Sequence, residues 1–158
     1  MKLIAPMVLA AAFAPASMRA LERSRALWAT VDVCSPSDQP NFVGVRGSMP
    51  GDAHSGDVMY MRFRIQYEEA STHRWVNLAK GADSGFVKVG SASLARQDGR
   101  SFRFITNQQT FMLRGDVTFQ WRRGQSVLGT VSRVTQAGHA SLVGADPKNY
   151  SAATCKLS

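Results

Sequence analysis

Arginine is the residue type in this sequence with the clearest potential for recognition chemistry, because arginines recur at alternate positions in two segments. Arg62 and Arg64 lie in one segment, and Arg114 and Arg122 lie in the other. A guanidinium group donates two parallel hydrogen bonds, which suits carboxylate, sulfate and phosphate. Tyr60 belongs to the same alternating series as Arg62 and Arg64. If the segments are neighbouring strands, these side chains form one face that favours an anionic polymer or an acidic protein as partner.

A solvated strand face without any partner is the ordinary alternative, since charged residues are normal on the exposed side of a sheet. Glu68 and Asp116 fall on the same face and neutralise part of it, and Arg123 follows at its edge. The tripeptide Arg114-Gly115-Asp116 resembles an integrin-recognition motif. That kind of binding needs an exposed loop tip, whereas this tripeptide lies inside a predicted strand, so we interpret it as a cross-strand charge pattern.

Three aromatic residues suggest a second kind of binding. Trp28, Trp75 and Tyr60 are expected on outward-facing positions of predicted strands. A row of exposed aromatic rings would stack against sugars, so a carbohydrate-binding module is the alternative function. Aromatic residues more often pack in cores and interfaces, which disfavours this alternative.

Catalytic chemistry has little support in the sequence. His54, His73 and His139 occur in three separate predicted loops, and neither a nucleophile elbow nor a zinc-binding helix motif is present. Asp52, His54 and Asp57 share one Gly-rich loop that could hold a cation, but such residues are also common in turns. We therefore expect a protein that is not an enzyme and has neither a metal nor a cofactor. A hydrolase with a loop-built site is the less favoured alternative.

Two long strands are the elements that must position the arginines. Apolar residues occupy every second position of residues 58–68, and residues 110–122 repeat this pattern with Trp121 in the apolar row. A period of two is typical of a half-buried strand, because successive side chains point to opposite faces. Gly115 also falls in the apolar row, where glycine indicates a bulge or a close approach by a neighbouring segment.

Weaker patterns predict the remaining strands and turns. These strands are expected over residues 27–34, 42–46, 75–78, 86–89, 101–105, 127–135 and 151–157. We expect the last of them beside the first, and Asp98-Gly99 predicts a tight hairpin turn. Short strands separated by Gly-, Pro- and Asp-containing turns, with no convincing amphipathic helix, are typical of a single all-β antiparallel sandwich.

The amino-terminal residues have the pattern of a secretory signal peptide. A charged start precedes the apolar run 3–13 and a small-x-small sequence that ends at Ala16. The run is shorter than the about 20 residues that a membrane-spanning helix needs. Cleavage after Ala16 and cleavage after Ala20 both fit, and an uncleaved anchor or a buried first helix is the alternative. The predicted organisation is a signal peptide over residues 1–20 and one secreted domain over residues 21–158, without a membrane span after cleavage.

Cysteine content and charge fit an exported protein. Cys34 and Cys155 lie near opposite ends of the predicted domain, and an even pair in an exported protein predicts a disulfide that joins these terminal segments. Two free thiols are the alternative. The formal net charge of +8 favours contact with anionic surfaces but carries no information about the fold.

Several stretches together support a family resemblance. They are residues 26–34, 44–51, 81–85 and 150–155. These stretches resemble uncharacterised secreted bacterial domains of immunoglobulin-like or fibronectin-type-III-like form. The resemblance implies export and an immunoglobulin-like sandwich of about seven to nine strands, in which the two long strands are neighbours. It implies no activity, so the expected function is a non-catalytic binding, adhesion or structural role at the cell exterior.

Overall fold

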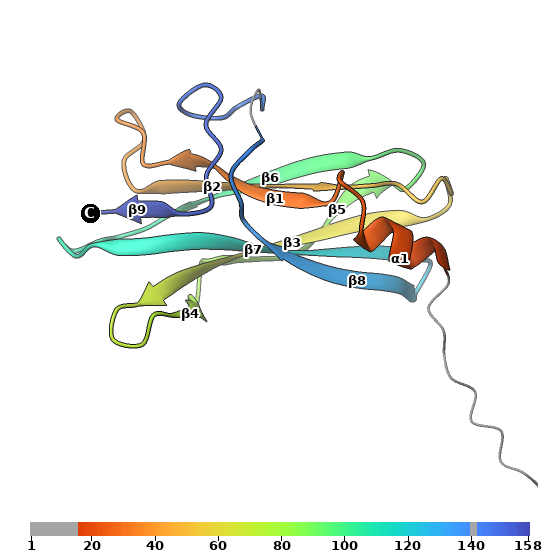
Figure 1. Cartoon of the computed structure of the whole chain (residues 1–158), viewed down its shortest axis with the longest axis horizontal. Helices are drawn as coiled ribbons and strands as arrows, with labels where there is room; N and C mark the ends of the chain where they lie inside the picture. Colours follow the sequence, from red (N-terminus) through yellow and green to blue (C-terminus); the bar gives the residue numbers. More distant parts are fainter. Residues whose placement is uncertain (1–15, 140–141) are drawn as a thin grey trace, which may run out of the picture.

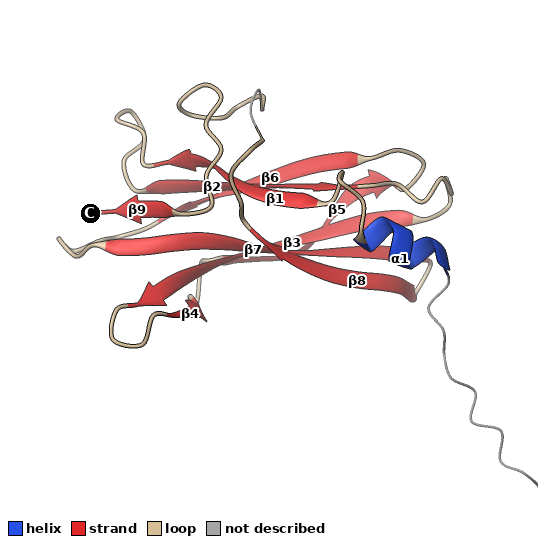
Figure 2. Cartoon of the chain, in the orientation of Figure 1, coloured by secondary structure: helices blue, strands red, loops and turns tan. Residues whose placement is uncertain are grey.

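Two antiparallel sheets pack face to face in this computed structural model, which describes residues 16–139 and 142–158 (Figure 1). The elements are α1 (Ala16–Glu22), β1 (Trp28–Cys34), β2 (Phe42–Met49), β3 (Val58–Glu69), β4 (Arg74–Asn77), β5 (Asp83–Ser91), β6 (Arg96–Arg103), β7 (Phe111–Arg123), β8 (Ser126–Val134) and β9 (Cys155–Leu157). This confirms the predicted all-β class, since α1 is the one helix of the described residues (Figure 2). The apolar run 3–13 lies outside these residues. Within them, no helix is both long and apolar enough for a membrane span.

The two sheets differ in size. The smaller sheet has the strand order β1-β2-β6. The larger sheet has the order β4-β3-β7-β8, with β5 also paired to β3 and β9 also paired to β7. β4 and β5 share one edge of β3, since β5 pairs along residues 58–64 and β4 pairs along residues 66–69. The two long strands predicted from the sequence are therefore the centre of the larger sheet.

The core lies between the sheets and is built from the alternating apolar rows of β3 and β7. Their fully buried members are Met59, Met61, Phe63, Ile65, Leu113, Val117, Phe119 and Trp121. Gly115 interrupts the apolar row of β7 because neighbours approach closely: a Cβ there would lie 2.6 Å from a Val45 methyl carbon and 2.7 Å from a Thr135 methyl carbon. The buried Trp121 indole donates a 3.0 Å hydrogen bond to the Pro50 carbonyl oxygen, so its polar atom is satisfied.

The hairpin turn predicted at Asp98-Gly99 is wrong, because both residues lie inside β6. Gly99 stands opposite Arg46 in the β2–β6 ladder, and a Cβ at Gly99 would lie 3.2 Å from the Val45 carbonyl oxygen. The glycine therefore permits close approach between strands. The Asp98 carboxylate accepts a 3.0 Å hydrogen bond from Arg100, so Asp98 is held within the strand as well.

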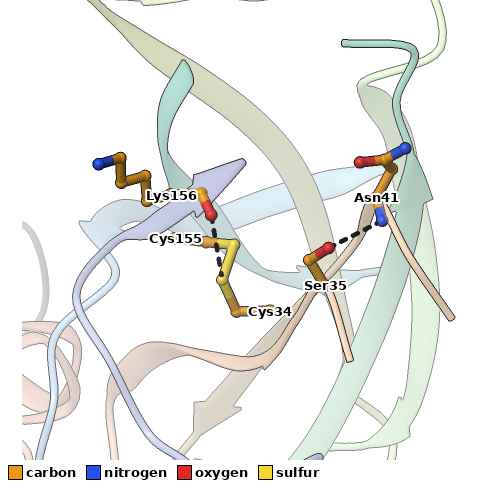
Figure 3. Close-up of a disulfide and its surroundings, with 5 residues drawn as sticks. All are labelled: Cys34, Ser35, Asn41, Cys155 and Lys156. Carbon is orange, nitrogen blue, oxygen red and sulfur yellow. Dashed lines mark hydrogen bonds between the residues drawn. A yellow bond between two sulfur atoms is a disulfide. The ribbon is translucent and has the colours of Figure 1, made fainter. Parts of the chain in front are cut away.

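The carboxy-terminal segment lies beside the first strand only in part. Ala152 pairs with Val31 of β1, but β9 itself pairs with β7 of the larger sheet. The chain thus crosses between the sheets shortly before Cys155. The predicted disulfide is present: Cys34 at the end of β1 and Cys155 at the start of β9 are bonded, with their Cα atoms 5.5 Å apart (Figure 3). The bond therefore joins the two sheets.

Removing this crosslink should destabilise the protein strongly. The bond spans 121 residues, and a loop of this size restricts the unfolded chain by about 4–5 kcal/mol in the chain-entropy model. We expect Cys34→Ser to lower the melting temperature by roughly 10 °C or more, measured by circular dichroism. Wild-type protein under reducing conditions should melt at the same temperature as the variant. Equal melting temperatures for oxidised wild type and Cys34→Ser would contradict this assignment of the bond's role.

Candidate functional site

The outer side of the larger sheet brings together the arginines that the sequence singled out. In the β3–β7 ladder, Arg62 stands opposite Thr118, and Gln66 stands opposite Arg114. Because both strands bury their apolar rows in the core, their arginines point away from it. We call this surface the basic sheet face. Its members are Tyr60, Arg62, Arg64, Arg114 and Arg122 of the two central strands, and Trp75, Phe86 and Lys88 of β4 and β5, which pair on the same side.

The two arginines at the middle of the face are neutralised by carboxylates. Arg62 donates to both oxygens of Asp83, with distances of 2.9 Å from Nε and 2.5 Å from Nη2. Arg64 donates a 2.5 Å hydrogen bond to Asp116. The Arg62 guanidinium lowers the pKa of Asp83 through these hydrogen bonds. Asp83 is therefore ionised at neutral pH, and in each pair a carboxylate offsets the charge of the arginine.

The two outer arginines are held by aromatic rings instead. The Arg114 guanidinium lies 4.3 Å from the centre of the Trp75 ring, and its Nε donates a 2.8 Å hydrogen bond to Gln66. Burial lowers the pKa of Arg114, but a guanidinium remains charged at any physiological pH. Arg114 has no carboxylate within ion-pair distance among residues 16–139 and 142–158.

Arg122 repeats this arrangement at the other end of β7. Its guanidinium lies 4.0 Å from the centre of the Tyr60 ring and 5.0 Å from that of Phe86, while its Nε donates to the side-chain oxygen of Gln120. In the described part of the chain it too lacks a carboxylate partner. Arg114 and Arg122 are eight positions apart on one strand, or about 26 Å. Two cations on aromatic supports thus stand at opposite ends of the face.

The aromatic residues do not form an open platform for sugars. Trp28 lies on β1 of the smaller sheet, so it cannot form a row with Tyr60 and Trp75 of the larger sheet. The Trp28 ring stacks on the His139 ring, with the ring centres 4.0 Å apart and the planes 14° apart. Each of the three rings therefore already has one face against a side chain, since arginines cover Trp75 and Tyr60.

Arg123, the last residue of β7, belongs to a separate cluster with residues of the loop before β3. It donates two 2.7 Å hydrogen bonds, one to each carboxylate oxygen of Asp57, which is only 1% exposed. Asp52 and His54 offer ligand atoms close to those of Asp57, all within 4.8 Å of one another. With Met18, Val127 and Leu128, the four residues line a cavity of about 420 Å³. Because Arg123 of β7 occupies both oxygens of Asp57, the negative charge of this loop residue is compensated from a neighbouring strand.

Burial and charge act in opposite directions on the two carboxyl groups of this cluster. Hydrogen bonds from Arg123 lower the pKa of Asp57. Burial raises the pKa of Asp52, and the neighbouring Asp57 raises it further. Ionised Asp57 therefore stabilises the fold, whereas ionised Asp52 opposes it.

The sequence missed several residues of this region. Asp83, Phe86 and Lys88 reach the face from β5, whose pairing with β3 shifts register twice, between Met59 and Tyr60 and between Arg62 and Arg64. The alternating positions of Phe86 and Lys88 in the predicted strand indicated that they share one face. Asp83 precedes that predicted strand, so no sequence pattern indicated its position.

Compared with known proteins, the chain matches no family model and no curated protein sequence.

The Asp52–Asp57 cluster predicts two opposite substitution effects. The folded pKa of Asp57 lies below its ordinary value of 3.8, so its contribution to stability exists above that pH and is lost as the pH falls through the folded pKa. Asp57→Asn should lower the melting temperature at pH 7 more than at pH 3. Asp52→Asn should raise the melting temperature at pH 7, because it removes a charge that burial disfavours. An Asp57→Asn loss of equal size at both pH values would show that the ion pair is not its cause.

Proposed function

We propose that this chain is an exported, non-catalytic binding domain of immunoglobulin-like form, and that its basic sheet face binds an anionic polymer outside the cell. Export is supported by the leader-like pattern before residue 17 and by the disulfide, since such bonds persist in oxidising compartments. The observation that carries the binding proposal is the pair of guanidinium groups, Arg114 and Arg122, that stack on aromatic rings and lack carboxylate partners in the described residues.

Aromatic support prepares these arginines for binding. Each Nε–H donates to a glutamine, and within the described residues the Nη groups of these stacked guanidiniums remain for sulfate, phosphate or carboxylate oxygens. Because Trp75 and Tyr60 restrict the arginine rotamers, less conformational entropy is lost when an anion binds. Lys88 stands opposite Tyr60 and adds a further cation near Arg122.

The separation of the cations favours a polymer over a small anion. Arg114 and Arg122 are about 26 Å apart along β7, and the neutral pairs of Arg62 and Arg64 lie between them. A small anion can reach only one end of the face. An extended chain with repeated negative groups can engage both ends at once, so the second contact is intramolecular and adds affinity.

The two alternatives have less support. A carbohydrate-binding module needs uncovered ring faces, whereas Tyr60 and Trp75 are covered by arginines. A hydrolase needs convergent titratable groups, and Asp52, His54 and Asp57 do converge on one cavity. Arg123, however, occupies both carboxylate oxygens of Asp57. His73 and His139 lie elsewhere and contact Glu68 and Trp28.

The test is retention on immobilised heparin, a sulfated polyanion, at about 0.15 M salt, where exposed charges are screened beyond about 8 Å. The double variant Arg114→Glu/Arg122→Glu should elute at a clearly lower salt concentration than wild type. The control is Arg25→Glu/Lys148→Glu, which makes the same change in net charge at exposed loop positions outside the face. The control should elute close to wild type, provided that both variants melt as wild type does.

A conservative pair of substitutions separates charge from guanidinium geometry. Arg114→Lys/Arg122→Lys keeps both charges but removes the planar donor fork, so we expect elution between that of wild type and that of the glutamate variant. If wild type passes through the column unretained, or if the loop control weakens retention as much as the face variant, the face is not a specific polyanion site.

A further inference from the structure

A methionine of α1 fits over a glycine of the larger sheet. Met18 is 3% exposed and belongs to the hydrophobic core. A Cβ at Gly129 of β8 would lie 2.1 Å from the Met18 methyl carbon, the flexible end of that side chain, so the glycine gives Met18 room in the position it occupies. Gly129 stands opposite the fully buried Trp121 in the β7–β8 ladder. Met18 therefore lies over the residue of β8 that pairs with Trp121.

Other residues of α1 also contact the folded domain or the chain that follows the helix. Leu21 packs against the core, and Arg133 of β8 donates a 2.5 Å hydrogen bond to the Glu22 carbonyl oxygen. The Arg23 amide donates a 3.3 Å hydrogen bond to the Arg19 carbonyl oxygen. Figure 1 shows α1 lying against β8 at one end of the larger sheet. Residues 18–22 thus form part of the folded domain.

From these contacts we propose that the leader is removed between Ala16 and Ser17, so that the exported protein keeps Met18 and all of α1 except its first residue. This inference rests on the export part of the proposed function. A signal peptidase would hydrolyse the Ala16–Ser17 peptide bond with one water molecule, which leaves a carboxylate on Ala16 and a free amine on Ser17. Cleavage after Ala20, the other bond that the sequence allows, would remove Met18 and uncover Gly129.

The residues before each bond support the same choice. Signal peptidases select small residues one and three positions before the cut. Ala16 and Ala14 satisfy this for the first bond, whereas Met18 stands three positions before the second. Cleavage after Ala20 would also remove Arg19 and leave the Arg23 amide without its acceptor. The residue preference of signal peptidases and the packing of α1 therefore both favour cleavage after Ala16.

The experiment expresses the full-length chain in a secreting bacterium and determines the amino-terminal residue of the exported protein by intact mass and sequencing. A chain that begins at Ser17 supports the inference. A chain that begins at Leu21, or at any other residue, overturns it while leaving export intact. An uncut 158-residue chain retained in the cell overturns both this inference and the export proposal. Heparin retention is measured separately, so its failure is distinguishable from either result.

Matched variants test the cleavage site and the packing of Met18 separately. Ala16→Phe should abolish formation of the product that begins at Ser17, whereas Ala20→Phe should leave processing unchanged.

In the exported protein, Met18→Ala should lower the melting temperature by about 5 °C or more, because it empties a buried site. Arg19→Ala, at an exposed position of the same helix, should change it by about 1 °C or less. An unchanged melting temperature for Met18→Ala would overturn the packing argument.

Discussion

The register between β3 and β7 is the constraint on which the rest of this structure depends. Met61 stands opposite Phe119 with both side chains in the core, and the next pair, Arg62 and Thr118, points outward. A slip of one residue would exchange the two faces, because side chains alternate strictly along a strand. Such a slip would bury guanidinium groups, and burying an unpaired charge costs far more than the core could return. The basic sheet face and the core are therefore two sides of one pairing.

The smaller sheet depends on the chain that follows β8. The described parts of that segment meet the free side of β1, where the Gln136 amide donates to the Ala29 carbonyl and Ala152 pairs with Val31. They cover an edge that would otherwise expose unpaired backbone groups. Asp32 of β1 is buried there against Arg46 at 2.7 Å, and Arg46 also donates a 2.6 Å hydrogen bond to the Val143 carbonyl oxygen. Arg46 of β2 thus pairs with the buried carboxylate and also holds the segment that covers β1. The Cys34–Cys155 bond fixes the end of that segment.

Arginine serves two different purposes in this protein. Where a carboxylate lies within reach, as Asp83 does for Arg62, the pair ties neighbouring strands and cancels its own charge. Where an aromatic ring lies within reach, as Trp75 does for Arg114, the charge is kept and oriented. A count of basic residues along the sequence cannot separate these cases. The distinction decides which arginines are available to an anionic partner.

The sequence by itself determined the all-β class, the two central strands and the common side of their arginines, because a period-two pattern depends only on local backbone geometry. It also indicated the disulfide, since an even pair of cysteines behind a leader-like sequence favours such a bond. Only the tertiary structure decided the partners of the arginines, the place of Asp98-Gly99 inside β6 and the crossing of the last segment to β9. Those features arise from register shifts and close approaches between segments far apart in the chain. Such contacts leave no periodic trace in either segment, so they become visible only when the sheets are assembled.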